Sequence, residues 1–385
     1  MRNKLILIVL PLLLCLGCSS LLFDQKEVSS LERRELKNID NLKDSSLFDY
    51  SLQDNIEDVV SDQFIFRNSM ISFYNEMIIN ISNLFSDSFI MYHNDILNYQ
   101  GYLLDPIIKT NNSYSENLKN RAYNIKSISE KYPDLPIYVY KPTRLEETNL
   151  IDIEHIYSKG SDNNYMYWGE LGNVTYKVMD INSVDMYKDF YYKTDLHWNP
   201  KGAYQGYTDI IELLNNNFEL GDVKEKEEMI CYQKDFHGSY SNKIGQKFQP
   251  ENLCDIKVKG IGTYKYFEND KEVFIDEIKQ NYINGIFLEQ YSDYDNYFGN
   301  NPLERRFEFG DNTGVNALFF VDSYINVNKT WIASHFDTTI MLDMRSKPKD
   351  FNLDEYIVKY DIDTIVVSMY HYNLYENGYN FIPIE

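Results

Sequence analysis

An acid and an imidazole stand two residues apart near the middle of this chain, at Asp195 and His197. In an extended segment that spacing puts both side chains on one face. A carboxylate can fix the tautomer of a neighbouring histidine, which can then take a proton from a serine hydroxyl. Ser323 is the candidate serine, because it stands between an apolar run and the expected start of a helix. These three residue types predict a nucleophilic serine site.

A helix is expected directly after the acid and the histidine. Asn199 can cap its first turn, and Pro200 suits the first helical position. Apolar residues then recur at helical spacing, at Ala203, Tyr204, Tyr207, Ile210, Ile211 and Leu214. The pair is therefore expected at the end of an ordered segment, where a helix begins.

The last 75 residues or so predict how Ser323 is positioned. Short apolar runs at 317–321, 339–342 and 364–368 alternate with expected helices, one reaching about His335 and one at 354–360. This βαβαβ order predicts a parallel sheet, whose ligand site lies at the carboxyl ends of its strands. Those strand ends carry Ser323, Asp343 with Arg345, and His371 with Asn373. Backbone N–H groups at the helix start after Ser323 are expected to hold an oxyanion.

Upstream, an expected helix at 116–131 precedes a buried strand at 137–140, which continues the alternation of helices and strands typical of an α/β sheet. Arg144 follows that strand and can hold an anion or a substrate hydroxyl, or form a surface ion pair. Residues 70–85 carry a strong amphipathic period and predict a helix. Residues 217–310 show no clean period and are interpreted as a partly β insertion that borders the substrate cleft.

Other interpretations of the candidate residues stay open. Ser323 can be only a helix N-cap, and His371 is a rival base because it also follows a strand. His335 lies inside the expected helix and is assigned to solvent or core. A metal-dependent hydrolase built on Asp195 and His197 lacks the further clustered ligands that zinc or manganese requires, so no metal and no cofactor are expected.

Composition narrows the function classes. The 385 residues carry 37 Lys+Arg against 59 Asp+Glu, a net charge of -22 that repels phosphates and excludes nucleic-acid binding. The hydrophobic fraction of 43% supports a sizeable core. The 34 tyrosines and 22 phenylalanines are interpreted mainly as core, with stacking on sugar rings as the alternative.

The N-terminus predicts export. Arg2 and Lys4 precede a short apolar run, and Leu16-Gly17-Cys18 is similar to a bacterial lipobox, in which the cysteine is lipidated. Residues 1–18 are therefore interpreted as a lipoprotein signal peptide, with an ordinary cleaved signal or an uncleaved anchor as alternatives. Residues 19–49 are polar and are expected to tether the protein to the membrane.

Two cysteines remain in the exported part. Cys231 and Cys254 are compatible with one disulfide or with two buried thiols.

The block Tyr191 to Trp198, followed by Gly202-Ala203-Tyr204, resembles the signature of the bacterial DHHW proteins, with Leu196 in place of the first histidine of the motif. Four more segments resemble blocks of that family: Asp62-Gln63-Phe64 with Arg67, Phe236-x-Gly238-Ser239, Asp322-Ser323-Tyr324 and Asp343-x-Arg345. These proteins in turn look like the SGNH-type domain of alginate O-acetyltransferases. The resemblance implies that residues 50–385 form a three-layer α/β SGNH-hydrolase-like domain, with its parallel sheet in permuted order and 217–310 as the insertion.

The resemblance also implies roles. Asp195 would orient His197, His197 would be the base, and Ser323 would be acylated. Asn373, Tyr324, Arg345 and Trp198 would border the oxyanion or the substrate. The implied function is an O-acyltransferase or esterase at the extracytoplasmic face of the cell membrane. Its partners would be a cell-surface glycan and a membrane-bound O-acyltransferase that supplies the acyl group. The alternative is a catalytically inactive glycan-binding or assembly lipoprotein of the same fold.

Overall fold

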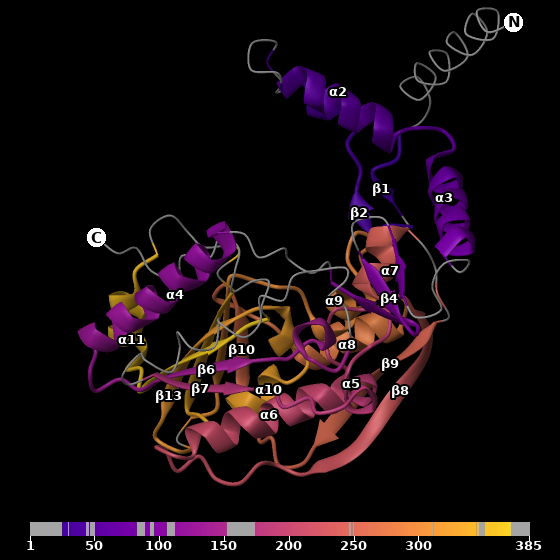
Figure 1. The fold of residues 1–385 in the computed structure, drawn as a ribbon. Coiled ribbons are helices and arrows are strands. Elements are labelled where there is room, and N and C mark those ends of the chain that lie inside the picture. Colours follow the sequence, from indigo (N-terminus) through magenta and orange to yellow (C-terminus); the bar gives the residue numbers. More distant parts are fainter. Residues whose placement is uncertain are drawn as a thin grey trace, which may run out of the picture.

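A mixed eight-stranded sheet forms the centre of the molecule in the computed structural model (Figure 1), with strand order β11-β10-β12-β14-β13-β15-β6-β7. The structure describes residues 25–29, 31–43, 46, 51–82, 89–92, 96–105, 112–151, 174–245, 248, 250–310, 312–343, 345 and 351–370. The strands of this sheet are β6 (Ile137–Lys141), β7 (Val174–Val178), β10 (Lys265–Glu268), β11 (Lys271–Glu272), β12 (Glu304–Glu308), β13 (Asn316–Val321), β14 (Thr338–Asp343) and β15 (Thr364–Ser368).

Five neighbouring strands of the sheet, β14-β13-β15-β6-β7, run parallel. They include the three C-terminal strands and the 137–140 strand predicted from the sequence. The strand that precedes Ser323 is therefore flanked by later elements, with β6 and β7 added at the far edge. This confirms the predicted α/β class with parallel strands at the centre of the sheet.

The region 217–310, expected as a partly β insertion, extends the sheet. It supplies β10, β11 and β12, which pair antiparallel with each other and onto β14. On β12, buried and half-buried residues alternate, as on a strand with one face toward the core.

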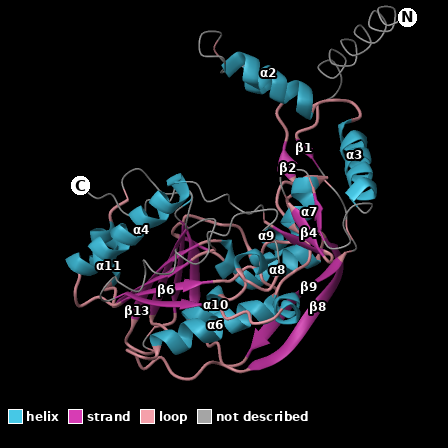
Figure 2. Cartoon of the chain, viewed as in Figure 1, coloured by secondary structure: helices cyan, strands magenta, loops and turns pink. Residues whose placement is uncertain are grey.

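The two faces of the sheet bury different side chains, which makes three layers. In β13, Ala317, Phe319 and Val321 join one core cluster, whereas Leu318 and Phe320 join the other. Alternation with period two is what a strand covered on both faces produces. The helices lie accordingly on both sides of the sheet (Figure 2).

One face carries α4 (Asn112–Lys131) and α11 (Leu353–Tyr360), and the other carries α5 (Val184–Phe190), α6 (Pro200–Leu214) and α10 (Lys329–Ala333). As predicted, Asn199 caps α6 by accepting from the backbone N–H groups of Lys201 and Gly202, and Pro200 opens the helix. Shorter helices are η1 (Ile39–Leu42), η3 (Leu145–Glu147), α7 (Ser239–Ile244), α8 (Ile275–Ile283), α9 (Asp293–Phe298) and η5 (Ser323–Asn326).

A long ribbon of β8 (Lys226–Phe236) and β9 (Glu251–Val258) lies beside α5 and α6. Cys231 and Cys254 face each other across it and form a disulfide, which decides between the two alternatives that the sequence left open. A small sheet of β3 (Phe89–Met91), β4 (Leu97–Tyr99) and β5 (Tyr102–Leu104) packs near α7.

The N-terminal part forms a small module of β1 (Val28–Ser29), β2 (Arg34–Glu35), η1, α2 (Ser51–Asp62) and α3 (Arg67–Ser82). Residues 25–29 and 31–43, which lie in the range interpreted as a polar tether, contain β1, β2 and η1. Arg34 pairs with Asp62 at 2.5 Å, and the amide of Gln63 bonds to the backbone of Lys26 and Lys37. No helix in the described ranges is long and apolar enough to cross a membrane, and Cys18 lies outside them.

Candidate active site

Asp195, His197 and Ser323 meet at one edge of the parallel sheet. His197 Nε2 lies 2.7 Å from Ser323 Oγ, and His197 Nδ1 lies 2.5 Å from Asp195 Oδ1. All three side chains are buried, with Ser323 the most accessible at 7% exposed. Two segments 126 residues apart in sequence thus bring an acid, an imidazole and a hydroxyl into one hydrogen-bonded chain. This arrangement lets the imidazole accept the serine proton.

The acid and the histidine are brought together by a tight loop, which differs from the extended segment expected from their spacing. A β-bridge between Tyr191 and Trp198 closes the loop, and His197 N–H donates to Asp195 Oδ1 at 2.9 Å. Glu251 on β9 accepts from the backbone N–H groups of Lys193 and Thr194 at 2.8 and 2.9 Å. The loop is therefore held by its own bridge and by the β8–β9 ribbon.

The second oxygen of Asp195 is held by α7. Ser239 N–H donates to Asp195 Oδ2 at 2.6 Å, and Gly238 N–H donates to the hydroxyl of Thr194 at 3.0 Å. Burial would raise the pKa of Asp195, but the charge and hydrogen bond of His197, together with the two backbone N–H donors, lower it below its ordinary value. The carboxylate therefore stays ionised beside the imidazole.

Ser323 is placed by the end of β13. Asp322, not Ser323, is the N-cap of η5, and its carboxylate accepts from the backbone N–H of Tyr324 at 3.0 Å and of Tyr370 at 2.7 Å. The capping interpretation of Ser323 thus applies to its neighbour. The backbone N–H of Tyr324, at the helix start expected to hold the oxyanion, already donates to the Asp322 carboxylate. It is therefore not available to an oxyanion.

An aromatic ring covers the histidine. Tyr294, on α9, stacks on His197 with ring centroids 3.8 Å apart and planes 4° from parallel, and its hydroxyl donates to the carbonyl of Ser323 at 3.1 Å. Its neighbour Asp295 brings a second carboxylate close. Burial raises the pKa of Asp295, as does the charge of Asp195, while the charge of His197 works against that rise. Neither residue was singled out from the sequence, because the 217–310 segment carries no period.

Arg144 is fully buried behind the loop. Its guanidinium donates to the carbonyl of Leu196 at 2.6 Å and lies 3.3 Å from Glu146. The hydroxyl of Tyr324 donates to the same carbonyl. Leu196 separates Asp195 from His197, so both donors hold the peptide that joins the acid to the base. Neither the anion-binding nor the surface ion-pair interpretation of Arg144 describes this contact.

Two of the residues expected to border the oxyanion or the substrate, Trp198 and Tyr324, are buried in the core. Trp198 has no exposed surface, and its indole N–H donates to the carbonyl of Tyr324 at 3.0 Å. Tyr324 is equally buried. Both therefore hold the loop from inside the core, and their expected contact with a substrate stays a prediction. Arg345 remains partly exposed at the end of β14, where it forms a two-pronged ion pair with Asp343, with Nε to Oδ1 at 2.9 Å.

The remaining expectations fall in two groups. Asn373 and the rival base His371 lie outside the described residues. His335 is buried and bonded to the Tyr207 hydroxyl at 2.7 Å and to the carbonyl of Leu220 at 2.8 Å; burial lowers its pKa to about 4. Of the two assignments made from the sequence, solvent or core, His335 therefore belongs to the core. Among the residues that the structure describes, no group of three or more His, Cys, Asp or Glu is placed to hold a metal ion.

No protein-family model and no curated protein matches this chain. Solved structures do match it. Bacillus cereus PatB1 is 21% identical over 77% of this chain and 100% of its own, with a TM-score of 0.60. PatB1 with a sulfonyl adduct matches at 19% identity over 74% of this chain and 99% of its own, with a TM-score of 0.59. A DHHW family protein from Eubacterium siraeum DSM 15702 matches at 17% identity over 74% of this chain and 92% of its own, with a TM-score of 0.54. The O-acetyltransferase domain of Pseudomonas putida AlgJ is also found, at 12% identity over 74% of this chain and 92% of that domain, with a TM-score of 0.38. The likeness to PatB1 and to the DHHW protein establishes a shared fold.

Proposed function

We propose that this protein is an exported, membrane-anchored O-acyltransferase or esterase that acts on a cell-surface polysaccharide through Ser323. The observation that carries the proposal is the buried chain from Ser323 Oγ through His197 to Asp195, with distances of 2.7 and 2.5 Å. The first distance lets His197 act as a base on the serine, and the second lets Asp195 orient the imidazole. The fold shared with PatB1, which has been solved with a sulfonyl adduct, supports the proposal.

In the first half of the reaction, Ser323 Oγ attacks the carbonyl carbon of the acyl donor while His197 Nε2 takes the hydroxyl proton. The proton then passes from His197 to the leaving group, and an acyl ester remains on Ser323. In the second half, a sugar hydroxyl gives its proton to His197 and its oxygen attacks the carbonyl carbon of this ester. The bond between that carbon and Ser323 Oγ then breaks, and His197 returns the proton to the serine oxygen. Water in place of the sugar makes the enzyme an esterase. Asp195 stays ionised throughout and stabilises the imidazolium.

The oxyanion of each tetrahedral intermediate needs hydrogen-bond donors close to Ser323. The backbone N–H of Ser323 itself and the side chain of Asn373, which follows β15 in the chain, are the groups we assign to it. Arg345, partly exposed at the neighbouring strand end, is our candidate for contact with the substrate. Tyr294 covers the ring of His197, and the carboxylate of Asp295 lies close enough to interact with its charge.

For location and partners, the proposal rests on the leader sequence. Cys18 would carry the lipid, and a membrane-bound O-acyltransferase would deliver the acyl group to Ser323. Replacement of Cys18 by alanine should therefore release the protein from the membrane fraction and abolish incorporation of labelled palmitate. Retention of the label after this substitution would contradict lipidation at Cys18.

Hydrolysis of 4-nitrophenyl acetate tests the chemistry. The wild type should release acetate, and Ser323→Ala should lower kcat by about 1000-fold or more, as is typical of losing a serine nucleophile. Ser334→Ala is the matched control, because Ser334 is also buried but its hydroxyl donates to a backbone carbonyl, that of Trp331, at 2.7 Å. It should keep wild-type turnover.

Mass spectrometry after treatment with a sulfonyl fluoride provides a second readout, with the adduct expected on the peptide that contains Ser323. Equal turnover in the wild type and in Ser323→Ala would rule out this serine. If neither acyl turnover nor adduct is seen, while the protein binds glycan in a manner insensitive to His197→Ala, the inactive glycan-binding lipoprotein is the better description. Addition of an oligosaccharide acceptor then separates transfer from hydrolysis in an active enzyme.

A further inference from the structure

Helix α3 carries two apolar faces, and only one of them packs on the body of the protein. On the packed face, the side-chain amide of Asn75 donates to the carbonyl of Ile244 at the end of α7, and a methyl of Ile71 lies against Gly245. Ile79 packs on the small core cluster that contains Tyr240. Residues 71, 75 and 79 recur every four positions, so they form one stripe along the helix.

The second apolar face is open to solvent. Its members are large apolar or aromatic side chains with exposed fractions between 41% and 69%: Met70, Phe73, Tyr74, Met77 and Ile81, hereafter the Met70 stripe. At 100° per residue, this stripe is centred about 145° around the helix from the packed face. The sequence predicted a strongly amphipathic helix over residues 70–85, which includes all five of these residues. The structure separates the apolar residues of α3 into a packed stripe and an exposed one.

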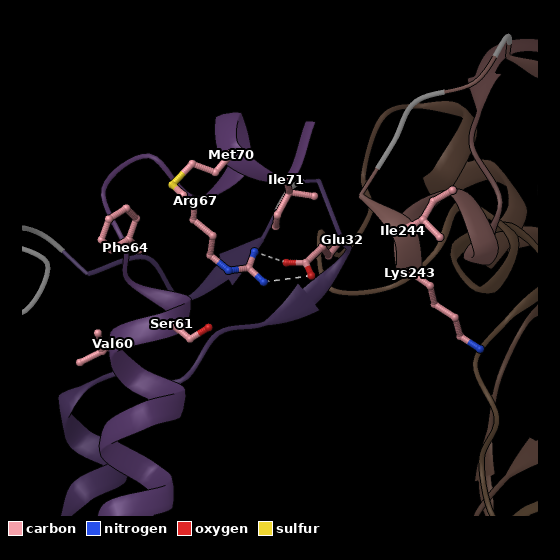
Figure 3. Close-up of a pocket in the computed structure, with 9 residues that line it drawn as sticks. All are labelled: Glu32, Val60, Ser61, Phe64, Arg67, Met70, Ile71, Lys243 and Ile244. Carbon is pink, nitrogen blue, oxygen red and sulfur yellow. Dashed lines mark hydrogen bonds and ion pairs between the residues drawn. The ribbon is translucent and has the colours of Figure 1, made fainter. Parts of the chain in front are cut away.

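The Met70 stripe is continuous with other apolar surface of the same module. Phe66 and Ile65, in the turn before α3, are 58% and 43% exposed. A cavity of about 390 Å³ lies between the module and the end of α7, and Met70, Phe64 and Ile71 contribute to its lining (Figure 3). Exposed large apolar side chains scattered singly are ordinary, but a contiguous row of this kind marks an interaction surface.

The chain outside the described residues indicates what covers this surface. The apolar leader ends at Cys18, seven residues before Gln25, and seven residues span at most about 25 Å. Gln25 belongs to the same module as α3, because its side chain accepts from the backbone N–H of Ile39 at 2.8 Å. A membrane anchor at Cys18 would therefore hold Gln25 within about 25 Å of the lipid surface, and with it the module that contains α3.

We propose that the Met70 stripe lies on the membrane surface, with α3 parallel to the bilayer and its apolar side chains among the lipid headgroups and upper acyl chains. A helix with methionine, phenylalanine, tyrosine and isoleucine on one face and polar residues on another is suited to that position. With a net charge of -22, the protein gains nothing from anionic lipids, so apolar burial drives the contact. The inference rests on the proposed anchor at Cys18 but not on the proposed chemistry.

Membrane contact by α3 would also orient the active site. Helix α7 connects the two regions: the carbonyl of Ile244 at its end accepts from Asn75, and the N–H of Ser239 at its start donates to Asp195. Six helical residues are about 9 Å long. The acid of the site is therefore joined to the membrane helix by a single short, rigid element.

The test uses the full lipoprotein in phosphatidylcholine vesicles, at fewer than one chain per vesicle. A cysteine at Met77→Cys carries an environment-sensitive NBD label, and the wild type without an added cysteine gives the background. Ser72→Cys is the matched control, since Ser72 is also exposed but lies roughly 140° around the helix from Met77. A nitroxide-bearing lipid serves as quencher.

The label at 77 should be quenched at least threefold more than the label at 72. Equal quenching at both positions, or none at 77, would overturn the proposal. A blue-shifted label at 77 that the lipid nitroxide does not quench would show that protein covers the stripe, either a second copy or another segment of this chain, and would also refute it. Hydrolysis of 4-nitrophenyl acetate by both labelled variants checks folding. Because that readout is independent of lipid, a failure of the membrane contact is distinguishable from a failure of the proposed chemistry.

Discussion

Substitution of Gly238 by alanine probes how α7 holds the acid of the site. Gly238 has φ of -72°, so alanine meets no backbone strain there. A Cβ at this position would, however, lie 2.3 Å from the carbonyl oxygen of Thr194 and 2.4 Å from the Cβ of Asp195. Ordinary contacts between carbon atoms are about 3.5 Å, so α7 and the loop must move apart by about 1 Å.

That movement would remove a hydrogen bond from Asp195. The bond from Ser239 N–H is 2.6 Å long, and a further 1 Å or so puts it beyond hydrogen-bond range. A hydrogen bond to a charged group contributes about 1.5–3 kcal/mol, which converts to roughly a 10- to 150-fold lower kcat if the lost contact stabilised the imidazolium formed in the transition state.

The assay is kcat for 4-nitrophenyl acetate, with thermal unfolding measured in parallel to establish that the variant folds. Gly260→Ala is the control, because Gly260 has φ of +69° and no atom within 4 Å of a new Cβ. It should lose about 1 kcal/mol of stability from backbone strain and keep its activity. A folded Gly238→Ala protein with wild-type kcat would refute the reasoning.

Three further predictions concern the surroundings of the site. Arg144→Lys keeps the positive charge but loses the fork that holds the Leu196 carbonyl, so kcat should fall about 10- to 100-fold with KM little changed; an unchanged kcat would contradict a positioning role. Burial raises the pKa of Glu146 to about 7, so the folded state binds the extra proton below that pH, and the resulting stability is lost as pH rises through 7. Between pH 5 and 8 the wild type should lose about 2–3 kcal/mol of unfolding free energy relative to Glu146→Gln, with both free energies measured by denaturant unfolding. If the unfolding free energies of the two proteins change with pH in parallel, the prediction is wrong. Replacement of both Cys231 and Cys254 by serine should lower the unfolding free energy by about 3 kcal/mol, because the disulfide closes a loop with a sequence separation of 23; urea denaturation with no change in midpoint would be the contrary result.

The sequence predicted those parts of the fold whose signals are local. Apolar runs that alternate with helical periods identified β13, β14, β15 and β6, and Asn199-Pro200 identified the start of α6. Because parallel strands deliver their carboxyl ends to one edge, the position of Ser323 followed from the order of elements. The spacing of Asp195 and His197 was informative too, although a turn and not an extended strand brings them together.

The parts that could not be predicted depend on segments distant in sequence. Tyr294 and the N–H of Ser239 reach the site from the aperiodic 217–310 region, so no pattern links them to His197. Arg144 could be placed at a strand end, but its acceptor is a backbone carbonyl, which leaves no trace in the residue types. The period of residues 70–85 predicted the helix α3, but the exposure of the Met70 stripe could not be predicted, because periodicity reports that a face is apolar and not what covers it.

The position of β15 has a consequence for biosynthesis. It lies between β13 and β6 and pairs with both, yet at residues 364–368 it is synthesised later than both of these strands. A chain emerging from its N-terminus therefore holds two half-sheets that cannot join until nearly all of its length has been delivered. Pairings this distant along the chain close slowly and leave strand edges uncovered in the meantime. We expect such a nascent chain to depend on chaperone protection, and a stop codon placed just before Thr364 should leave the protein unable to assemble its centre.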